Sequence, residues 1–424
     1  MATVALVAAL AAAACSSDSS ESEGLTTTAL PLATAPPATA PTSGPASTEP
    51  GSTPPVGTDD DDDPTNSGAS TTAGAPSSTI PVPTYDFSAV SPIVQAVVEA
   101  NGLNGAGLII VDRDHGVIHE DYWGEFDADR ISLVASSSKM ITAGVLLHLA
   151  DEGLLDMDAP VADVAGWGTD NPTITPAQLV SNSSGLLGLI DGLNAGPYAC
   201  QYLVDGTMQA CAEQIFATPD DDSLVIPPDT QFRYGGAQWQ IAGAVAEVAS
   251  GRSWAELIDE IYVQPCDLET LAYNNQWSQR DIGASGFDYP TGFDADPSRL
   301  LPTDNPNMEG GAYLTTGDYA KLLLMHLRGG MCGDTQVLSR AALDQAHADR
   351  TGETYGSTTG YGMGWWVDRV SGRIFDPGAY GAVPWLDLED GYGAYLVIES
   401  DTGIGTALAA QLYDVVDTAV NSAI

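Results

Sequence analysis

Apolar and polar positions form their strongest pattern in residues 131–155, where apolar side chains run almost without interruption. Met140, Val145 and Leu149 belong to this run, and Gly153 follows it as a natural helix stop. A helix with so few polar positions is expected to be buried on most sides. These residues therefore predict a helix in the core.

The other periodic segments predict a sheet that takes strands from both ends of the chain. A short amphipathic helix at 91–102 precedes two strands at 107–112 and 117–123, which a tight turn joins. Further helices are expected at 175–180, 199–217, 236–249, 316–327 and 406–420, and further strands at 361–367, 379–386 and 394–400. Because helical segments separate the two groups of strands, we expect an α/β (α+β) fold with an inserted, mostly helical lobe.

The first 85 residues lack the pattern of a folded domain. Residues 1–15 are rich in Ala, Val and Leu and end at Cys15, which predicts a lipoprotein-type signal segment and lipidation of that cysteine. No Lys or Arg precedes the apolar run, and an ordinary signal peptide is the alternative. Residues 16–85 are rich in Thr, Pro, Ser and Ala and predict a disordered linker. The folded domain is expected over residues 86–424.

Charge and cysteine content favour an exported protein. The formal net charge is −44, which makes nucleic acid an unsuitable partner. Four cysteines remain besides Cys15, and an even number outside a reducing cytosol favours two disulfides. Of the three possible pairings we favour Cys200–Cys211 with Cys266–Cys332, because the first pair brackets one short segment. Their spacing is not that of metal ligands, and we expect no cofactor.

Lys139, one of only two lysines, lies in the predicted core helix three residues after Ser136. This spacing puts both side chains on one face of a helix. Burial disfavours a charged ammonium, and a neutral amine beside a serine hydroxyl can accept its proton and make it a nucleophile. Ser-x-x-Lys is short enough to occur by chance, but a lysine inside an apolar helix requires a reason.

Several segments occur together in one order: ASSSKMITAGVLLHLADEGLLDMDAPV, ITPAQLVSNSSGLLGL, FRYGGAQWQIAGAVAEVASGRSW, GGAYLTTGDYAKLLLMHLRGG, YGMGWWVD and FDPGAYGAVPWLD. In this order they resemble the serine beta-lactamase-like hydrolases, which include class C beta-lactamases, penicillin-binding DD-peptidases and related esterases. The resemblance covers roughly residues 88 to 422. It implies a beta-lactamase/transpeptidase-like fold with an antiparallel sheet, in which a sheet lobe takes about 86–135 and 310–424 and a helical lobe about 136–309.

By position, the resemblance makes Ser136 the acyl-accepting nucleophile, Lys139 its base and Tyr234 the residue that shuttles the proton to the leaving group. The oxyanion hole would be the backbone N–H groups of Ser136 and of Ala379 on a strand edge. The positions expected to bind substrate are Asp376, Gly378 and Gly236. The three short motifs, Ser136 to Lys139, Tyr234 to Gly236 and Asp376 to Gly378, contain no histidine, which disfavours a Ser-His-Asp hydrolase.

Two motifs depart from the family pattern. The usual Tyr-x-Asn is Tyr234-Gly235-Gly236, which lacks the amide, and the usual Lys-Thr-Gly or His-x-Gly is Asp376-Pro377-Gly378, where an anion replaces a cation. We expect an anion there to repel the carboxylate of penicillins and D-Ala peptides, and hence weak or no beta-lactamase activity. Two interpretations of Asp376 remain open: a turn residue before proline, or a group that selects neutral or cationic substrates.

The predicted function is a serine hydrolase that acts through a Ser136 acyl-enzyme on a small ester, amide or peptide-like substrate at the cell envelope. A beta-lactamase or D-alanyl-D-alanine carboxypeptidase is the first alternative, and a catalytically impaired surface-binding protein with the same fold is the second. The expected partners are the substrate and, through Cys15, the membrane. The expected location is the bacterial cell envelope or the exterior.

Overall fold

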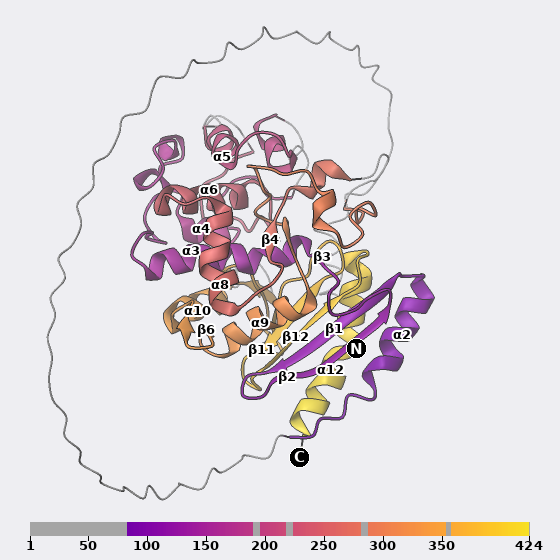
Figure 1. The fold of residues 1–424 in the computed structure, drawn as a ribbon. Helices are drawn as coiled ribbons and strands as arrows, with labels where there is room; N and C mark the ends of the chain where they lie inside the picture. Colours follow the sequence, from indigo (N-terminus) through magenta and orange to yellow (C-terminus); the bar gives the residue numbers. More distant parts are fainter. Residues whose placement is uncertain (1–82, 190–195, 218–223, 281–286, 353–357, 424) are drawn as a thin grey trace, which may run out of the picture. The chain divides into compact units, whose positions relative to one another are not determined.

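The computed structural model describes residues 83–189, 196–217, 224–280, 287–352 and 358–423 (Figure 1). The predictions for the signal segment, for lipidation of Cys15 and for the linker up to residue 82 fall outside the described residues.

A seven-stranded antiparallel sheet joins the two ends of the folded region, in the strand order β2-β1-β12-β11-β10-β9-β8. Its strands are β1 (Gly105–Asp112), β2 (Gly116–Gly124), β8 (Thr359–Tyr361), β9 (Trp366–Asp368), β10 (Ile374–Phe375), β11 (Val383–Asp387) and β12 (Tyr392–Val397). Gly107 of β1 pairs with Val397 of β12, and Asp112 pairs with Tyr392. The predicted fold class is therefore confirmed.

Strand β1 shows why the sheet has helices on both faces. Leu108 and Ile110 belong to an apolar cluster with α2 (Val90–Asn101) and α12 (Thr402–Asn421). Their neighbours Ile109 and Val111 belong to the cluster that includes α9 (Thr316–Leu327). Successive side chains of a strand point to opposite faces. An apolar strand with no polar alternation therefore needs cover on both sides, and α2 and α12 lie together along one face in Figure 1.

In the sequence, the remaining α-helices lie between β2 and β8. They are α3 (Lys139–Asp151), α4 (Pro176–Val180), α5 (Met208–Phe216), α6 (Ala237–Ser250), α7 (Trp254–Ile258), α8 (Gln264–Cys266) and α10 (Arg340–His347). Two small sheets complete the fold: β3 (Ser132–Leu133), β5 (Ala312–Leu314) and β4 (Ala272–Tyr273) form one, and β6 (Met331–Cys332) and β7 (Thr335–Gln336) form the other.

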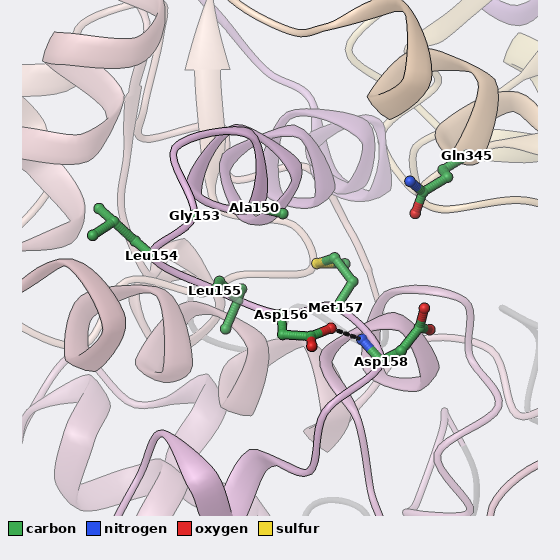
Figure 2. A pocket seen from close by; sticks show the side chains of 8 residues that line it. All are labelled: Ala150, Gly153, Leu154, Leu155, Asp156, Met157, Asp158 and Gln345. Carbon is green, nitrogen blue, oxygen red and sulfur yellow. Dashed lines mark hydrogen bonds between the residues drawn. The ribbon is translucent and has the colours of Figure 1, made fainter.

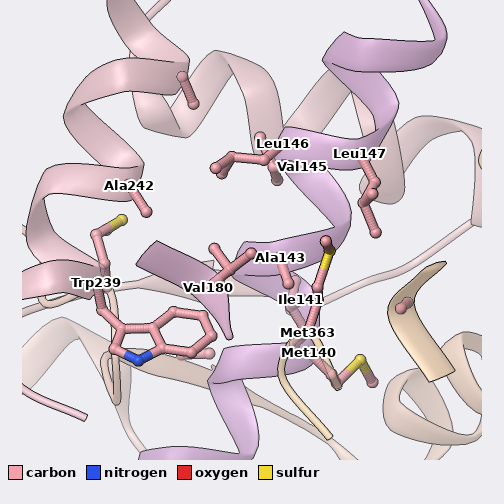
Figure 3. Close-up of a cluster of buried hydrophobic side chains, with 14 of the residues drawn as sticks. Met140, Ile141, Ala143, Val145, Leu146, Leu147, Val180, Trp239, Ala242 and Met363 are labelled. Atoms are coloured by element: carbon pink, nitrogen blue, oxygen red, sulfur yellow. The ribbon is translucent and has the colours of Figure 1, made fainter. Parts of the chain in front are cut away.

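Helix α3 is buried on most sides, as its sequence predicts. Figure 3 shows its side chains meeting Trp239 and Ala242 of α6 and Val180 of α4. Leu146 and its apolar neighbours in α3 are fully buried. Burial of each large aliphatic side chain contributes roughly 1.5–3 kcal/mol, so α3 is held mainly by packing. This packing fixes the beginning of α3, where Ser136 and Lys139 lie.

Two predicted elements are divided in the structure. The helix expected at 199–217 is a 3-10 helix, Gly196–Tyr202, followed by α5, because Gly206 has a positive φ and the Thr207 side chain caps α5 by accepting from Ala210 N–H. The strand expected at 361–367 is the hairpin of β8 and β9, since Gly364 between them has φ +82°.

The cysteine pairs are those that the sequence analysis favours. Cys200 is bonded to Cys211 and Cys266 to Cys332. The first bond joins the 3-10 helix Gly196–Tyr202 to α5, and the second joins α8 to β6.

Candidate active site

Ser136 and Lys139 meet at the start of α3. Ser136 lies in the 3-10 helix Ala135–Ser138, which leads directly into α3 at Lys139. The Lys139 ammonium nitrogen Nζ is 3.0 Å from Ser136 Oγ. Lys139 is 0% exposed and Ser136 is 9% exposed. Ala135, immediately before the serine, has φ +47°, a left-handed conformation that costs a non-glycine residue about 1–2 kcal/mol.

The other contacts of Lys139 come from two distant parts of the chain. Its Nζ donates to the backbone oxygen of Glu309 at 2.9 Å and lies 3.5 Å from the carboxylate oxygen Oε2 of the same residue. The ring centroids of Tyr234 and Trp239 are 4.7 Å and 5.6 Å from Nζ. Aromatic faces attract a cation, so the two rings add to the attraction of Glu309 for this nitrogen.

Tyr234 lies in the loop before α6 within an aromatic group. Its ring packs on Trp366 at 5.0 Å between centroids and on Tyr361 at 5.9 Å. Trp365, which precedes Trp366 in the sequence, is fully buried and packs edge-on against His326, with 5.4 Å between the ring centroids. Of the two tandem tryptophans, Trp366 is therefore the one beside the candidate site.

A turn between β10 and β11 packs against the segment that carries Ser136. Ser137 Oγ donates to the backbone oxygen of Asp376 at 2.6 Å, and Gly378 N–H donates to Ala382 O at 2.7 Å. Gly378 is required here because a Cβ would stand 2.0 Å from Val134 O. Ala379 lies in this turn and not on a strand edge, contrary to the sequence interpretation, and its N–H makes no hydrogen bond with any residue that the structure describes.

A family model described as Beta-lactamase matches residues 90–419 of the chain. The chain belongs to the beta-lactamase family. Proteins of this family are serine hydrolases, which confirms the predicted enzyme class. The match also agrees with the resemblance seen in the motifs.

Individual proteins support this assignment. Penicillin-binding protein 4 of Amycolatopsis lactamdurans is 27% identical over 330 residues, which cover 73% of this chain and 84% of that protein. The structure titled EstCE1, a hydrolase with promiscuous acyltransferase activity, has a TM-score of 0.64 at 18% identity, covering 78% of this chain and 98% of its own. A D-stereospecific amidohydrolase from Streptomyces sp. has a TM-score of 0.58 at 21% identity, covering 77% and 98%. At these identities the two structures establish the fold alone.

The structure corrects the sequence argument about Asp376. Its side chain is 0% exposed, and neither carboxyl oxygen makes a hydrogen bond of good geometry with any residue in the described ranges. Burial raises the pKa of Asp376 well above its usual range, although the Lys139 charge and the Met140 amide act in the opposite direction. The neutral acid is thereby favoured. Asp376 is not the exposed anion that was expected to repel a substrate carboxylate.

Gly236, at the family's asparagine position, is a requirement of the backbone. It has φ +78° and ψ −152° as the N-cap of α6, and a Cβ would stand 2.5 Å from Leu187 O. This region of backbone conformation is accessible essentially to glycine alone. The backbone at this position therefore cannot accommodate the asparagine that is usual in the family motif.

Glu309 is the residue of this site that the sequence analysis missed. It precedes Gly310-Gly311 and strand β5, and no periodic pattern distinguishes it. The available signal was a lone acid in the otherwise uncharged residues 305–317, immediately before the family-like segment that begins at Gly310.

A separate pocket lies near the far end of α3. It has a volume of about 420 Å³ and is lined mainly by residues 150–158, with Gln345 of α10 across from them (Figure 2). Its lining contains none of the candidate site residues.

Among the described residues, no group of His, Cys, Asp and Glu side chains is arranged to hold a metal ion. Within the same ranges, no helix has the length and apolar character needed to cross a membrane.

Proposed function

We propose that this chain is a serine hydrolase that forms an acyl-enzyme on Ser136, with a small ester, amide or peptide-like molecule as substrate. The observation that carries the proposal is the 3.0 Å contact between Lys139 Nζ and Ser136 Oγ, made by a lysine with no exposed surface. A hydroxyl in hydrogen-bond contact with a buried amine is one arrangement in which an adjacent base can activate a serine nucleophile.

The proposed reaction has two halves. In the first, Lys139 accepts the hydroxyl proton while Ser136 Oγ bonds to the substrate carbonyl carbon, and the leaving group departs with a proton returned through Tyr234. In the second, water attacks the acyl carbon by the same proton route and releases the acid. The backbone N–H groups of Ser136 and Ala379 would stabilise the oxyanion in both halves. Gly378 would let the turn that carries Ala379 approach the segment that carries Ser136 closely enough.

We further propose that the protein works at the cell envelope, anchored by a lipid on Cys15. Two disulfides support an oxidising compartment. The −44 net charge suits a soluble exported domain.

A D-alanyl-D-alanine carboxypeptidase is the second candidate, because the relative at 27% identity is a penicillin-binding protein. The absence of the motif cations and amide from positions 376 and 236 argues against it. Nitrocefin turnover comparable to that of p-nitrophenyl acetate would favour this second candidate or a beta-lactamase.

Labelling with a fluorophosphonate probe, followed by peptide mass analysis, tests the proposal. We expect one adduct on Ser136, none in Ser136→Ala, and a labelling rate at least about 10³-fold lower in Lys139→Ala. Lys321→Ala is the matched control, since this second lysine is partly exposed and pairs with Asp318; it should label like the wild type. A folded wild-type protein without an adduct would instead support the surface-binding alternative.

A further inference from the structure

The Glu309 carboxylate is buried beside the candidate base and is held from three directions. Oε2 accepts a hydrogen bond from Gly236 N–H at 2.7 Å and lies 3.5 Å from Lys139 Nζ. Oε1 accepts from the Tyr202 hydroxyl at 3.0 Å. Glu309 is 5% exposed. A buried carboxylate with a partner for each oxygen has a defined position and not a range of rotamers.

A helix N-terminus and a tyrosine hydroxyl both face this carboxylate. Gly236 is the N-cap of α6, so the carboxylate lies at the positive end of a 14-residue helix. Burial, followed by the negative charge of Glu309, raises the pKa of Tyr202 well above its usual range. Tyr202 therefore remains a neutral hydrogen-bond donor.

Gly235, next to the position where the family amide is missing, makes room for Glu309. A Cβ on Gly235 would stand 2.5 Å from Glu309 Oε2. Gly236 stands where the family has its amide and donates its N–H to the carboxylate, while Gly235 leaves the space that the carboxylate occupies beside Lys139. Glu309 supplies a hydrogen-bond acceptor to the lysine from a different part of the chain.

We propose that Glu309 is the third member of a Ser136–Lys139–Glu309 relay, in which it orients the base and stabilises the charge that the base acquires. A neutral amine has two N–H bonds and one lone pair. The backbone oxygen of Glu309 accepts one N–H bond at 2.9 Å, and the carboxylate lies 3.5 Å from Nζ as its charged partner. Ser136 Oγ is the third neighbour, at 3.0 Å, where its hydroxyl can face the lone pair. When Lys139 takes that proton, the new ammonium is paired with a carboxylate already in place, as an orienting acid supports a catalytic base in other hydrolases.

The inference rests on the proposed function, and Glu309→Gln tests it. Glutamine retains an acceptor for Gly236 N–H and removes the charge. With p-nitrophenyl acetate we expect kcat to fall about 10–100-fold while KM changes less than about 3-fold, because the lost interaction belongs to the transition state. Glu309→Ala should lose more, and Glu309→Asp should recover part of the rate.

Glu99→Gln on α2, an exposed position, is the control for the change in charge. Near-UV circular dichroism and the melting temperature establish that each variant is folded. If folded Glu309→Gln keeps the kcat of Glu99→Gln, or if its loss appears only in KM, the relay is wrong. If the wild type itself gives no adduct on Ser136 with the fluorophosphonate, the proposed function fails, and the relay fails with it.

Discussion

At the scale of single residues, the site is shaped by what the backbone permits. Gly236 adopts a conformation with φ +78° and ψ −152°, and Asp376 is enclosed without a polar partner of good geometry. Both stand at positions where family relatives carry other side chains. Each has a measurable consequence.

Restoring the family amide by Gly236→Asn should destabilise the protein. The substitution forces a side chain into a conformation that costs about 1–3 kcal/mol and places Cβ 2.5 Å from Leu187 O. We expect a loss of more than about 2 kcal/mol in the free energy of unfolding, measured in urea, and lower esterase activity.

Gly251→Asn at the other end of α6 is its matched control. Gly251 has φ +71° and ψ 14°, and a Cβ there meets nothing within 4 Å. Asparagine tolerates this left-handed conformation, so the change should stay within about 0.5 kcal/mol. Equal losses in the two variants would contradict the argument from Gly236.

Asp376→Asn should stabilise the protein increasingly as the pH rises. A carboxyl whose pKa is raised on folding contributes stability at low pH, and that contribution is lost as the pH rises through the folded-state pKa. Asparagine removes this loss at nearly constant volume. We expect a melting temperature about 2–4 °C higher than that of the wild type at pH 8, with a smaller difference at pH 5.

Asp349→Asn should change stability in the opposite direction. Burial acts to raise the pKa of Asp349, but hydrogen bonds from Arg369 and Thr351 lower it to about 2. A lowered pKa contributes stability above the unfolded-state value, so this variant should melt below the wild type at pH 8.

A pH-independent difference for Asp376→Asn would show that its carboxyl does not titrate as argued.

At the scale of elements, the first disulfide is connected to the site and the second is not. Cys200 lies two residues before Tyr202 in the 3-10 helix Gly196–Tyr202, and Tyr202 binds the Glu309 carboxylate. Cys266–Cys332 joins α8 to β6, and neither element contributes a candidate site residue. Stability and activity should therefore respond differently to the two bonds.

Replacing each pair by alanine separates the two effects. The bonds span 11 and 66 residues, for which loop entropy predicts losses of about 3 and about 4 kcal/mol in the free energy of unfolding. We expect kcat to fall about 3–10-fold for the Cys200–Cys211 pair only, measured well below the melting temperature. An equal loss of kcat in both variants would mean that the bonds act only through overall stability.

At the scale of the whole molecule, the net charge of −44 opposes compactness. Salt screens repulsion between exposed charges beyond about 10 Å at 0.1 M. We therefore expect the melting temperature to rise by on the order of 5 °C between low salt and half-molar NaCl. An osmolyte at equal osmolality controls for general solvent effects, and a melting temperature that falls with NaCl would contradict the argument.

The sequence by itself determined the features that local patterns encode. The buried run of α3 and the β1–β2 hairpin follow from hydrophobic periodicity. The three-residue spacing of Ser136 and Lys139 is a motif of the sequence itself. The order of the motifs predicted the family and, through it, the antiparallel sheet. Periodicity and motif spacing depend on near neighbours in the chain, and motif order depends on the sequence alone, so these features could be predicted before any packing was known.

Only the tertiary structure decided which groups surround the reacting atoms. Glu309 contacts Lys139 although the two residues are 170 positions apart in the sequence. Asp376 is buried in the turn to which Ser137 donates a hydrogen bond, and Ala379 lies in the same turn. No periodic signal records such contacts, because they arise from the way that separate elements close around the start of α3. The nucleophile was therefore predictable from its motif, whereas the charges around it were not.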